Sequence, residues 1–566
     1  MTVSPDEIQD FITAFEERLA PVEKASSEAW WNLATTGTEE AQKELVHAGM
    51  AYNELFADRG EYEMVRGWYE GRESLESSIL RRQVEILYKT FAGRQGDQET
   101  LRRIEELEAE ANAIYSNHRG VVGDREVNEN ELREILRVSD DRTLRREAWE
   151  ASKSVGQKVD SIVRELAHLR NRLARAEGFA DHHARSLDLQ EIDVVELARL
   201  MEDLQAASDE PFRGLKERLD TDLKGRFGIE EVMPWHLSDP FFQSCKQDAA
   251  ALPLSGWGGR PGGAPGAGAS GQVTDGGASA ASDLDLDHFF RDKELEALTR
   301  RTYDNMGLEV RDVLARSDLY ERPGKDQHAF CMRVGRSYPY DVRVLANVRQ
   351  DSYWMDTLLH EFGHAVYDKY INPSLPYLLR TIAHINSTEA IALMMGGLAD
   401  DPGWLSSIAG VSGEELEGAR ERLLRISQAD RLVFVRWALV MYRFEKALYE
   451  DPDREDLNDL WWDLVERIQL VNRPPDRNEP DWAAKLHVAL APVYYHNYVL
   501  GYLTAAQLRR HLEKDVVGGP FFTSELAGRY LQEAVFSQGA RDDWENTVLR
   551  ATGERLNPDY FVKSLL

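Results

Sequence analysis

The N-terminal part of the chain carries apolar side chains at helical intervals. From Asp6 to about Leu223 they recur every three or four positions, as at Leu101, Ile104 and Leu107. This spacing gathers apolar side chains on one face of a helix, and over such a length it predicts an antiparallel array of long helices. The same pattern returns after residue 389, over 423–449, 457–470 and 488–512. We therefore predict a mostly α protein.

A segment of small residues interrupts this pattern. Ser255 to Ser282 consists largely of Gly, Ala, Ser and Pro, which bury little apolar surface. Helical sequence continues on both sides of it, so we expect a flexible surface insertion within one domain that spans residues 1–566. No internal repeats are evident.

Charge and composition exclude several classes of protein. The 68 basic and 99 acidic residues give a formal net charge of −31, which disfavours nucleic acids and anionic membrane surfaces as partners. Residues 1–20 have no basic stretch followed by an apolar run, and no stretch of the chain has the length and apolarity of a membrane span. The two cysteines are too few for a disulfide framework. We expect a cytoplasmic protein; the sequence leaves its oligomeric state open.

The clearest strands lie shortly before residue 350. Residues 328–334 and 341–348 are rich in β-formers, and the segment between them contains Gly335 and Pro339. This pattern predicts a β-hairpin that leads directly into the next helix. An exposed edge of this hairpin can align an extended peptide by main-chain hydrogen bonds, whereas a hairpin that only closes the core is the alternative.

The next helix contains the motif His360-Glu361-Phe362-Gly363-His364. Residues at i and i+4 lie on one helical face, so His360 and His364 can direct imidazole nitrogens at one Zn²⁺. Glu361 lies beside that position, where the general base of a zinc hydrolase belongs. Two packed histidines without a metal are the alternative reading.

A catalytic zinc site needs a third protein ligand, and Glu389 is the candidate. It opens an apolar helix, residues 390–395, that can pack against the first. Asn386 and Glu389 also have the spacing of a capping box, in which the glutamate would fold back on the helix start. We predict one zinc ion per chain, bound by His360, His364 and Glu389.

In several short patches the sequence resembles the angiotensin-converting enzyme family of peptidyl-dipeptidases and, more distantly, thimet oligopeptidase and oligopeptidase F. The likeness extends over nearly the full length. Besides the HEFGH motif, the patches are residues 29–32, 234–239, 376–380, 389–391, 461–462 and 485–487. The resemblance implies a mostly helical, two-lobed molecule, with a deep channel between the lobes and zinc on the channel floor.

It also implies roles for residues near the C-terminus. His487 matches a histidine that hydrogen-bonds the tetrahedral intermediate, and Tyr498 matches the oxyanion-stabilising tyrosine. Tyr495 and Tyr498 fit the family's pair if one residue is inserted after His487, whereas without it the pair falls on Tyr494 and Asn497. Core packing is the alternative for each tyrosine.

The resemblance implies three substrate-binding residues: Tyr495 and two further residues, Lys485 and His328. Lys485 matches the lysine that binds a substrate's C-terminal carboxylate, and a solvated surface lysine is the alternative. His328 matches a histidine on the strand that aligns the substrate.

The chain also departs from the family. Leu393 replaces an acidic residue that orients a zinc ligand, so Asp356, one turn before His360, becomes a candidate for that task. Val465 replaces one of the arginines that bind activating chloride, and we expect no chloride activation of that kind.

We predict a zinc metallopeptidase that hydrolyses short peptides, with Lys485 favouring release of C-terminal dipeptides. Glu361, His487 and Tyr498 are its candidate catalytic residues. An endo-acting oligopeptidase is the alternative. A catalytically silent peptide-binding protein with structural zinc is a more remote one, because a structural site has no use for Glu361.

Overall fold

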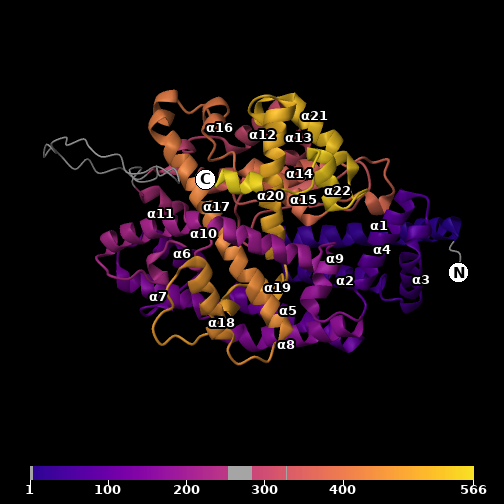
Figure 1. The fold of residues 1–566 in the computed structure, drawn as a ribbon. Coiled ribbons are helices and arrows are strands. Elements are labelled where there is room, and N and C mark those ends of the chain that lie inside the picture. Colours follow the sequence, from indigo (N-terminus) through magenta and orange to yellow (C-terminus); the bar gives the residue numbers. More distant parts are fainter. Residues whose placement is uncertain (1–3, 253–283, 327, 566) are drawn as a thin grey trace.

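Helices dominate the computed structural model, which describes residues 4–252, 284–326 and 328–565 (Figure 1). The prediction of a mostly α protein is confirmed. The predicted insertion, Ser255 to Ser282, lies outside the described residues.

The helices of the N-terminal part follow one another with short connections. They are α1 (Pro5–Thr36), α2 (Glu39–Glu54), α3 (Arg59–Glu70), α4 (Ser78–Ala92), α5 (Gln98–Asn117), α6 (Glu129–Val138), α7 (Arg142–Lys153), α8 (Gly156–Ala176), α9 (His182–Leu189) and α10 (Val194–Phe227). Side-chain caps begin many of them; Asp97, for example, accepts a hydrogen bond from the Thr100 N–H at 3.0 Å.

A small hairpin between α5 and α6 was not predicted. Strands β1 (Gly120–Val122) and β2 (Arg125–Val127) pair antiparallel, with Val121 opposite Glu126. Gly123 turns the chain between them with φ of +59°, a conformation that glycine adopts without steric cost. This hairpin is the one strand pair within the described part of a region that is otherwise helical, as predicted.

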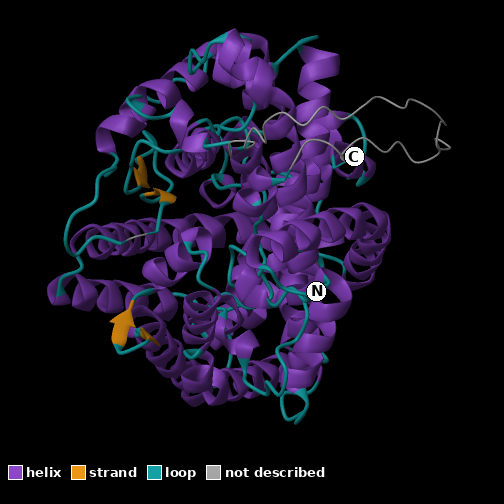
Figure 2. Cartoon of the chain, turned by 90° about the vertical axis from the view of Figure 1, so that its left-hand side faces the viewer, coloured by secondary structure: helices purple, strands orange, loops and turns teal. Residues whose placement is uncertain are grey.

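The predicted second hairpin is confirmed, with shorter strands. The helices α11 (Lys246–Ala251), α12 (Leu295–Asn305) and α13 (Arg311–Arg316) come first. Strands β3 (Phe330–Arg333) and β4 (Val342–Leu345) then pair antiparallel, with Phe330 opposite Leu345. Figure 2 shows the two hairpins as small pieces in a helical molecule.

Helices resume after β4. They are α14 (Ser352–Lys369), α15 (Ile385–Gly396), α16 (Pro402–Ser407), α17 (Gly413–Glu450), α18 (Leu457–Leu464), α19 (His487–Leu490), α20 (Tyr495–His511), α21 (Glu525–Ala534), α22 (Trp544–Thr552) and α23 (Asp559–Ser564). The single helix predicted over 488–512 is in fact two, α19 and α20. Pro492 lies in the break, and proline in a helix interior removes a hydrogen bond and clashes with the preceding turn.

Two large apolar clusters make up most of the core. One joins α5 to α10 with most of α17, α18 and the start of α20, and the other surrounds α14 and α15 together with β4 and α21. Helices α17 and α20 contribute residues to both clusters, for example Leu416 and Trp437 of α17. A smaller cluster unites α1, α3 and α4. The two long helices thus connect the N-terminal helices to those around residue 360.

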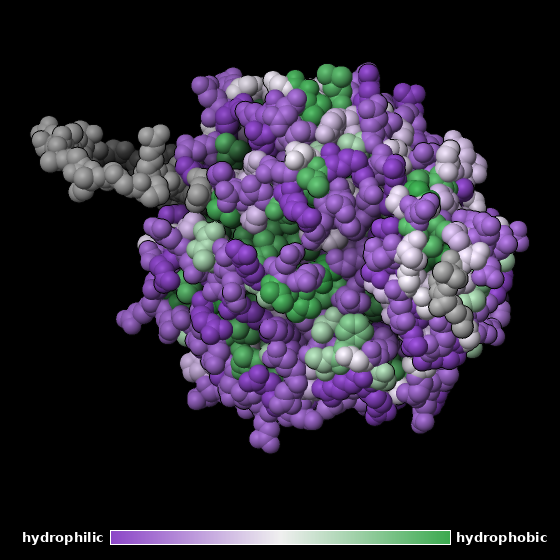
Figure 3. Space-filling model, turned by 45° about the vertical axis from the view of Figure 1, so that its right-hand side comes forward, coloured by the Kyte–Doolittle hydropathy of each residue, from purple (hydrophilic) through white to green (hydrophobic). Residues whose placement is uncertain are grey.

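The surface agrees with the strongly acidic composition. Figure 3 shows a face on which hydrophilic side chains predominate, with apolar side chains gathered near its middle. Among the helices that the structure describes, none combines the length and the apolar character needed to span a membrane.

Candidate metal centre

Local sequence fixes where the two helices of the centre begin. The carboxylate of Asp351 caps α14 by accepting a hydrogen bond from the Trp354 N–H at 2.8 Å. At α15 the cap is His384, whose ring accepts from the Asn386 N–H at 3.1 Å. The capping box that the spacing of Asn386 and Glu389 permits is therefore absent, because the helix begins two residues earlier, with His384 rather than Asn386 as its cap. Glu389 lies beyond the first turn and is available for another role.

Two glycines allow the helices to pack closely. A Cβ atom at Gly363 of α14 would lie 2.8 Å from the Cα of Ala392 on α15. A Cβ atom at Gly501 of α20 would lie 3.1 Å from the Cγ of Glu389. Real Cβ atoms do not approach backbone as closely as the first of these distances, so only glycine lets α14 lie this near α15. This close packing brings Glu389 over the histidines of α14.

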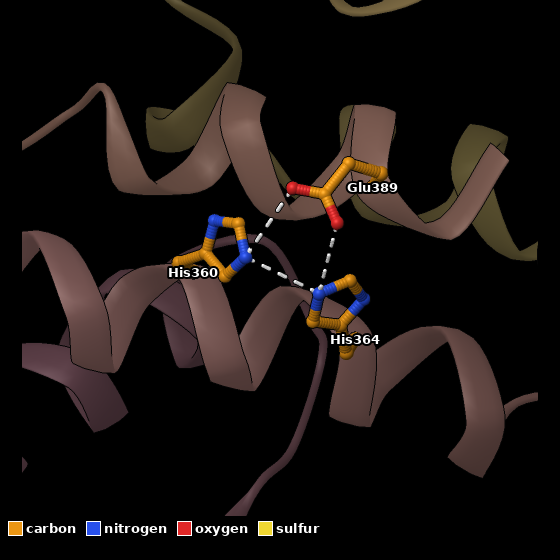
Figure 4. Close-up of side chains that lie close together, drawn as sticks. All are labelled: His360, His364 and Glu389. Carbon is orange, nitrogen blue, oxygen red and sulfur yellow. Dashed lines mark hydrogen bonds and ion pairs between the residues drawn. The ribbon is translucent and has the colours of Figure 1, made fainter. Parts of the chain in front are cut away.

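The side chains of His360, His364 and Glu389 converge (Figure 4). The two Nε2 atoms lie 3.3 Å apart, and the Glu389 oxygens lie 3.5 Å from Nε2 of His360 and 3.7 Å from Nε2 of His364. Ligands about 2.0–2.1 Å from a tetrahedral Zn²⁺ are about 3.3–3.4 Å apart. The observed separations and the mixed nitrogen and oxygen donors therefore fit this metal.

A hydrogen bond orients one of the two histidines. Nδ1 of His364 lies 2.7 Å from the hydroxyl oxygen of Thr388, on the helix turn that carries Glu389. With Nδ1 donating to Thr388, the lone pair of His364 is on Nε2, the atom that faces the other donors. Burial lowers the pKa of His364 well below its usual value, and the charge of His360 adds to this effect. His364 is thus neutral, as a metal ligand must be.

The second histidine has a different electrostatic environment. Burial alone would lower the pKa of His360, but nearby carboxylates, Glu389 first among them, raise it above the usual value. Asp356, the predicted partner of His360, forms an ion pair with Lys246 at 3.2 Å and contributes to this raised pKa through its charge. Of the two histidines, His364 is the one that forms a hydrogen bond to a neighbouring helix within the described residues.

Glu361 lies against the hairpin beside the centre. Its side chain is buried, and burial raises its pKa to about 7, although the charge of His360 and a hydrogen bond from the Cys331 backbone oppose the shift. Cys331 belongs to β3, so the hairpin and the metal helix meet at this carboxyl group. A carboxyl group with a pKa near neutrality can both accept and release a proton.

Lys485 is buried, which excludes the solvated surface lysine considered from the sequence. Its Nζ donates to Oε1 of Gln243 at 2.8 Å and lies 5.5 Å from the ring centre of Phe241. Burial, followed by the charge of Arg133, lowers the pKa of Lys485 to about 8. The lysine is thus charged at neutral pH, and the carboxylate of Asp239 nearby favours this state.

His487 begins α19, two residues after Lys485. Its Nδ1 is buried without a hydrogen-bond partner. Burial and the charges of Lys485 and His328 lower its pKa to about 3, so the ring is neutral throughout the physiological range. Its centre lies 5.0 Å from that of Tyr495. A neutral imidazole with an unpaired nitrogen can still form a hydrogen bond with a ligand.

The tyrosines of α20 differ in which charges act on them. Burial and then the charges of Glu389 and Glu361 raise the pKa of Tyr498. Burial, and after it the charges of Tyr498 and Glu389, raise the pKa of Tyr494. Tyr495 is buried and packs against Trp437 with ring centres 5.8 Å apart. Among these three tyrosines, Tyr498 is therefore the one on which both Glu389 and Glu361 act, and Tyr495 has the environment of a core residue.

His328 lies just before β3 and is exposed, with Nδ1 3.5 Å from a carboxylate oxygen of Asp326. A hydrogen bond from the protonated ring to this carboxylate raises the pKa of His328. Because His328 in turn lowers the pKa of His487, the two rings lie within electrostatic reach of each other.

Sequence reasoning missed two of the groups described here. Gln243 follows the recognised patch at residues 234–239 by four positions, so its vicinity gave a signal that was not used. Thr388, directly before Glu389, gave none, because only the packing of α15 on α14 reveals its contact with His364.

Comparison with known proteins finds two family models that match parts of the chain. The model of a family described as angiotensin-converting enzyme matches residues 3–212, and the model of peptidase family M3 matches residues 311–565. All three converging side chains lie in the second match. The chain is therefore similar to both peptidase families, each over less than half of its length.

Two curated proteins match a shorter stretch. Thermostable carboxypeptidase 1 of Pyrococcus furiosus is 25% identical over 146 residues, and carboxypeptidase 1 of Bacillus subtilis is 28% identical over 147 residues. Each alignment covers 24% of this chain and 28% of the relative, so the likeness is limited to part of each protein.

Proposed function

We propose that the protein is a zinc-dependent peptidase that hydrolyses short peptides and releases dipeptides from their C-termini. The observation that carries the proposal is the donor set of His360, His364 and Glu389, with Nε2 and carboxylate oxygens 3.3–3.7 Å apart and Glu361 buried beside it. One zinc ion per chain fits this set.

Zinc bound there supplies a Lewis acid that polarises the scissile carbonyl and acidifies the attacking water. Glu361 accepts the proton of that water and passes it to the leaving amine. Its pKa, raised to about 7 by burial, suits both transfers near neutral pH.

Tyr498 and His487 donate hydrogen bonds to the oxygen that becomes negative during attack. Both are neutral at physiological pH, since burial raises the pKa of the phenol and lowers that of the imidazole. Donors directed at a developing charge stabilise the transition state more than the ground state. Tyr495 packs behind them, against His487.

Lys485 binds the C-terminal carboxylate of the peptide, with Gln243 holding its ammonium group. A fixed distance from this anchor to the metal would set how many residues are released. His328 lies at the start of β3, whose backbone aligns the substrate in a channel between two lobes of a single domain. The two relatives are named carboxypeptidases, which also favours action at the C-terminus.

Metal analysis and product analysis test the proposal together. Protein purified without chelators should contain about one zinc per chain and lose activity with a chelator. Glu361→Gln should keep the metal and lose at least about 10³-fold in rate, because only the general base is removed. Near-normal turnover of this variant would show that the base lies elsewhere.

Mass spectrometry of products from N- and C-blocked peptides distinguishes the modes of cleavage. Successive loss of dipeptides from free C-termini supports the proposal. Cleavage of internal bonds in C-terminally amidated peptides would favour an oligopeptidase, and release of single residues a carboxypeptidase. Peptide binding without any turnover would identify a silent binding protein with structural zinc.

A further inference from the structure

Val493 has a backbone conformation that its side chain disfavours. Its φ is +54°, and among the described non-glycine residues with positive φ it alone is β-branched. Branching at Cβ crowds the backbone in this region, so such a conformation persists only where neighbouring groups hold it. Val493 lies in the break between α19 and α20, directly before the tyrosines.

Two side chains from distant helices hold the peptide groups of Val493. Oε1 of Glu445, on α17, accepts a hydrogen bond from the Val493 N–H at 2.9 Å. Nε2 of Gln190, just after α9, donates to the Val493 carbonyl at 3.2 Å. Since both partners are remote in sequence, tertiary contacts select this conformation.

One of these two residues, Gln190, also contacts the start of α20. Oε1 of Gln190 accepts a hydrogen bond from Nδ2 of Asn497 at 2.8 Å. Asn497 is the residue before Tyr498, and its backbone N–H donates to the Tyr494 carbonyl at 2.9 Å. The turn at Val493 and the first turn of α20 therefore share one set of contacts.

Glu445 has no part in the chemistry described above. Its side chain is ionisable but buried, with the residue only 1% exposed. Burial raises its pKa to about 8, although the hydrogen bond from Val493 and the charge of Arg170 oppose the shift. A protonated carboxyl group has the shape of an amide, so glutamine is a close substitute for it at this position. Burying a carboxyl group is costly, so a role is expected for Glu445, whose hydrogen-bond partner is the backbone N–H of Val493.

We propose that Glu445 is a positioning residue, which holds Val493 in its left-handed conformation and thereby fixes the direction in which α20 presents Tyr498 to the metal centre. This inference rests on the proposed function. Without Glu445, the Val493 N–H loses its acceptor, the turn relaxes toward negative φ, and the first turn of α20 shifts. A displacement of about 1 Å is enough to lower the rate about 10²-fold.

Leucine and glutamine at position 445 form a matched pair. Glu445→Leu removes the acceptor, whereas Glu445→Gln keeps it with the same shape. We expect kcat of the leucine variant to fall about 10- to 100-fold with KM and zinc content little changed, and kcat of the glutamine variant to stay near that of the wild type. Adding Val493→Gly to the leucine variant should restore part of kcat, because glycine adopts positive φ without strain.

Amide hydrogen exchange over residues 488–500, followed by mass spectrometry, gives a readout that does not depend on activity. Exchange should be faster in Glu445→Leu than in the wild type and unchanged in Glu445→Gln. A leucine variant with normal kcat overturns the proposal, and so does equal exchange in the two variants. If the leucine variant does not fold, Gln190→Leu removes the other half of the contact and must lower kcat; an unchanged kcat there also overturns it.

A failure of the proposed function looks different. If wild-type protein with bound zinc cleaves no peptide, the function is wrong, and no variant is needed to show it. The exchange measurement then still decides whether Glu445 holds Val493.

Discussion

The hydrogen bond between Thr388 and His364 allows a quantitative prediction for metal binding. Thr388→Val keeps the branched shape of the side chain and removes only the hydroxyl group, which lies 2.7 Å from Nδ1 of His364. In the metal-free protein the histidine can change tautomer to suit its surroundings. With zinc on Nε2, the proton must be on Nδ1, where it would be buried without an acceptor.

The cost of the substitution therefore falls on the metal-bound state. An unsatisfied buried donor costs about 1–3 kcal/mol. At about 1.4 kcal/mol for each factor of ten, this amounts to a 5- to 150-fold increase in Kd for zinc, roughly the 10- to 100-fold effect typical of residues that orient metal ligands.

Competition with a chromophoric zinc chelator, starting from metal-free protein, measures this Kd. Ser387→Ala is the matched control, since Ser387 is a buried neighbour on the same turn and donates its hydroxyl to Asn386 at 3.1 Å rather than to a zinc histidine. It should bind zinc as the wild type does. If the valine variant also binds zinc with wild-type affinity, or if both variants weaken it equally, the assigned role of Thr388 is wrong.

Two further predictions concern helix packing and pH. Gly363→Ala should separate α14 from α15, because its Cβ would lie 2.8 Å from the Ala392 Cα; a loss of about 1–3 kcal/mol in unfolding free energy and weaker zinc binding are expected. Gly225→Ala in α10, whose added Cβ would meet no atom within 4 Å outside its own helix backbone, is the control. It should leave zinc binding unchanged and raise the unfolding free energy by up to about 1 kcal/mol, because alanine favours a helix more than glycine does; a Gly363 variant as stable as this control would contradict the packing argument. Lys485 carries its charge below its lowered pKa of about 8, so kcat/KM for free-acid peptides should fall as pH rises through 8. Lys485→Arg, which stays charged, and amidated peptides, which lack the carboxylate, should not show this fall in a pH profile; a fall common to all three would point to another group.

Local features of the sequence were enough to predict the main elements of the site. The histidine spacing of the HEFGH motif defined α14, and two β-rich runs around Gly335 defined the hairpin beside it. The break before α20 also had a local signal, Pro492, which a reading based on apolar periodicity alone passed over. By contrast, β1 and β2 are only three residues each, too short for a periodic pattern to reveal them.

The remaining features depend on contacts between residues far apart in the chain. Gln243 meets Lys485 across 242 positions, and Val493 meets Gln190 across 303. The donor and acceptor groups of these residues permit such hydrogen-bonded pairs, but they permit many other pairs equally well. Only the packing of helices selects among them, as the contact of Gly501 with Glu389 illustrates.

The three metal donors all come from one helix pair, α14 and α15, whereas Lys485, His487 and Tyr498 come from segments about a hundred residues further on. In the proposed function, metal binding and substrate recognition thus lie on separate segments and can change independently in evolution. Substitutions in the later segments can alter which peptides are accepted while the helix pair keeps its metal. Homologues with an intact helix pair can then differ in specificity, and exchanging α14 and α15 between two of them should leave the substrate preference of each recipient unchanged.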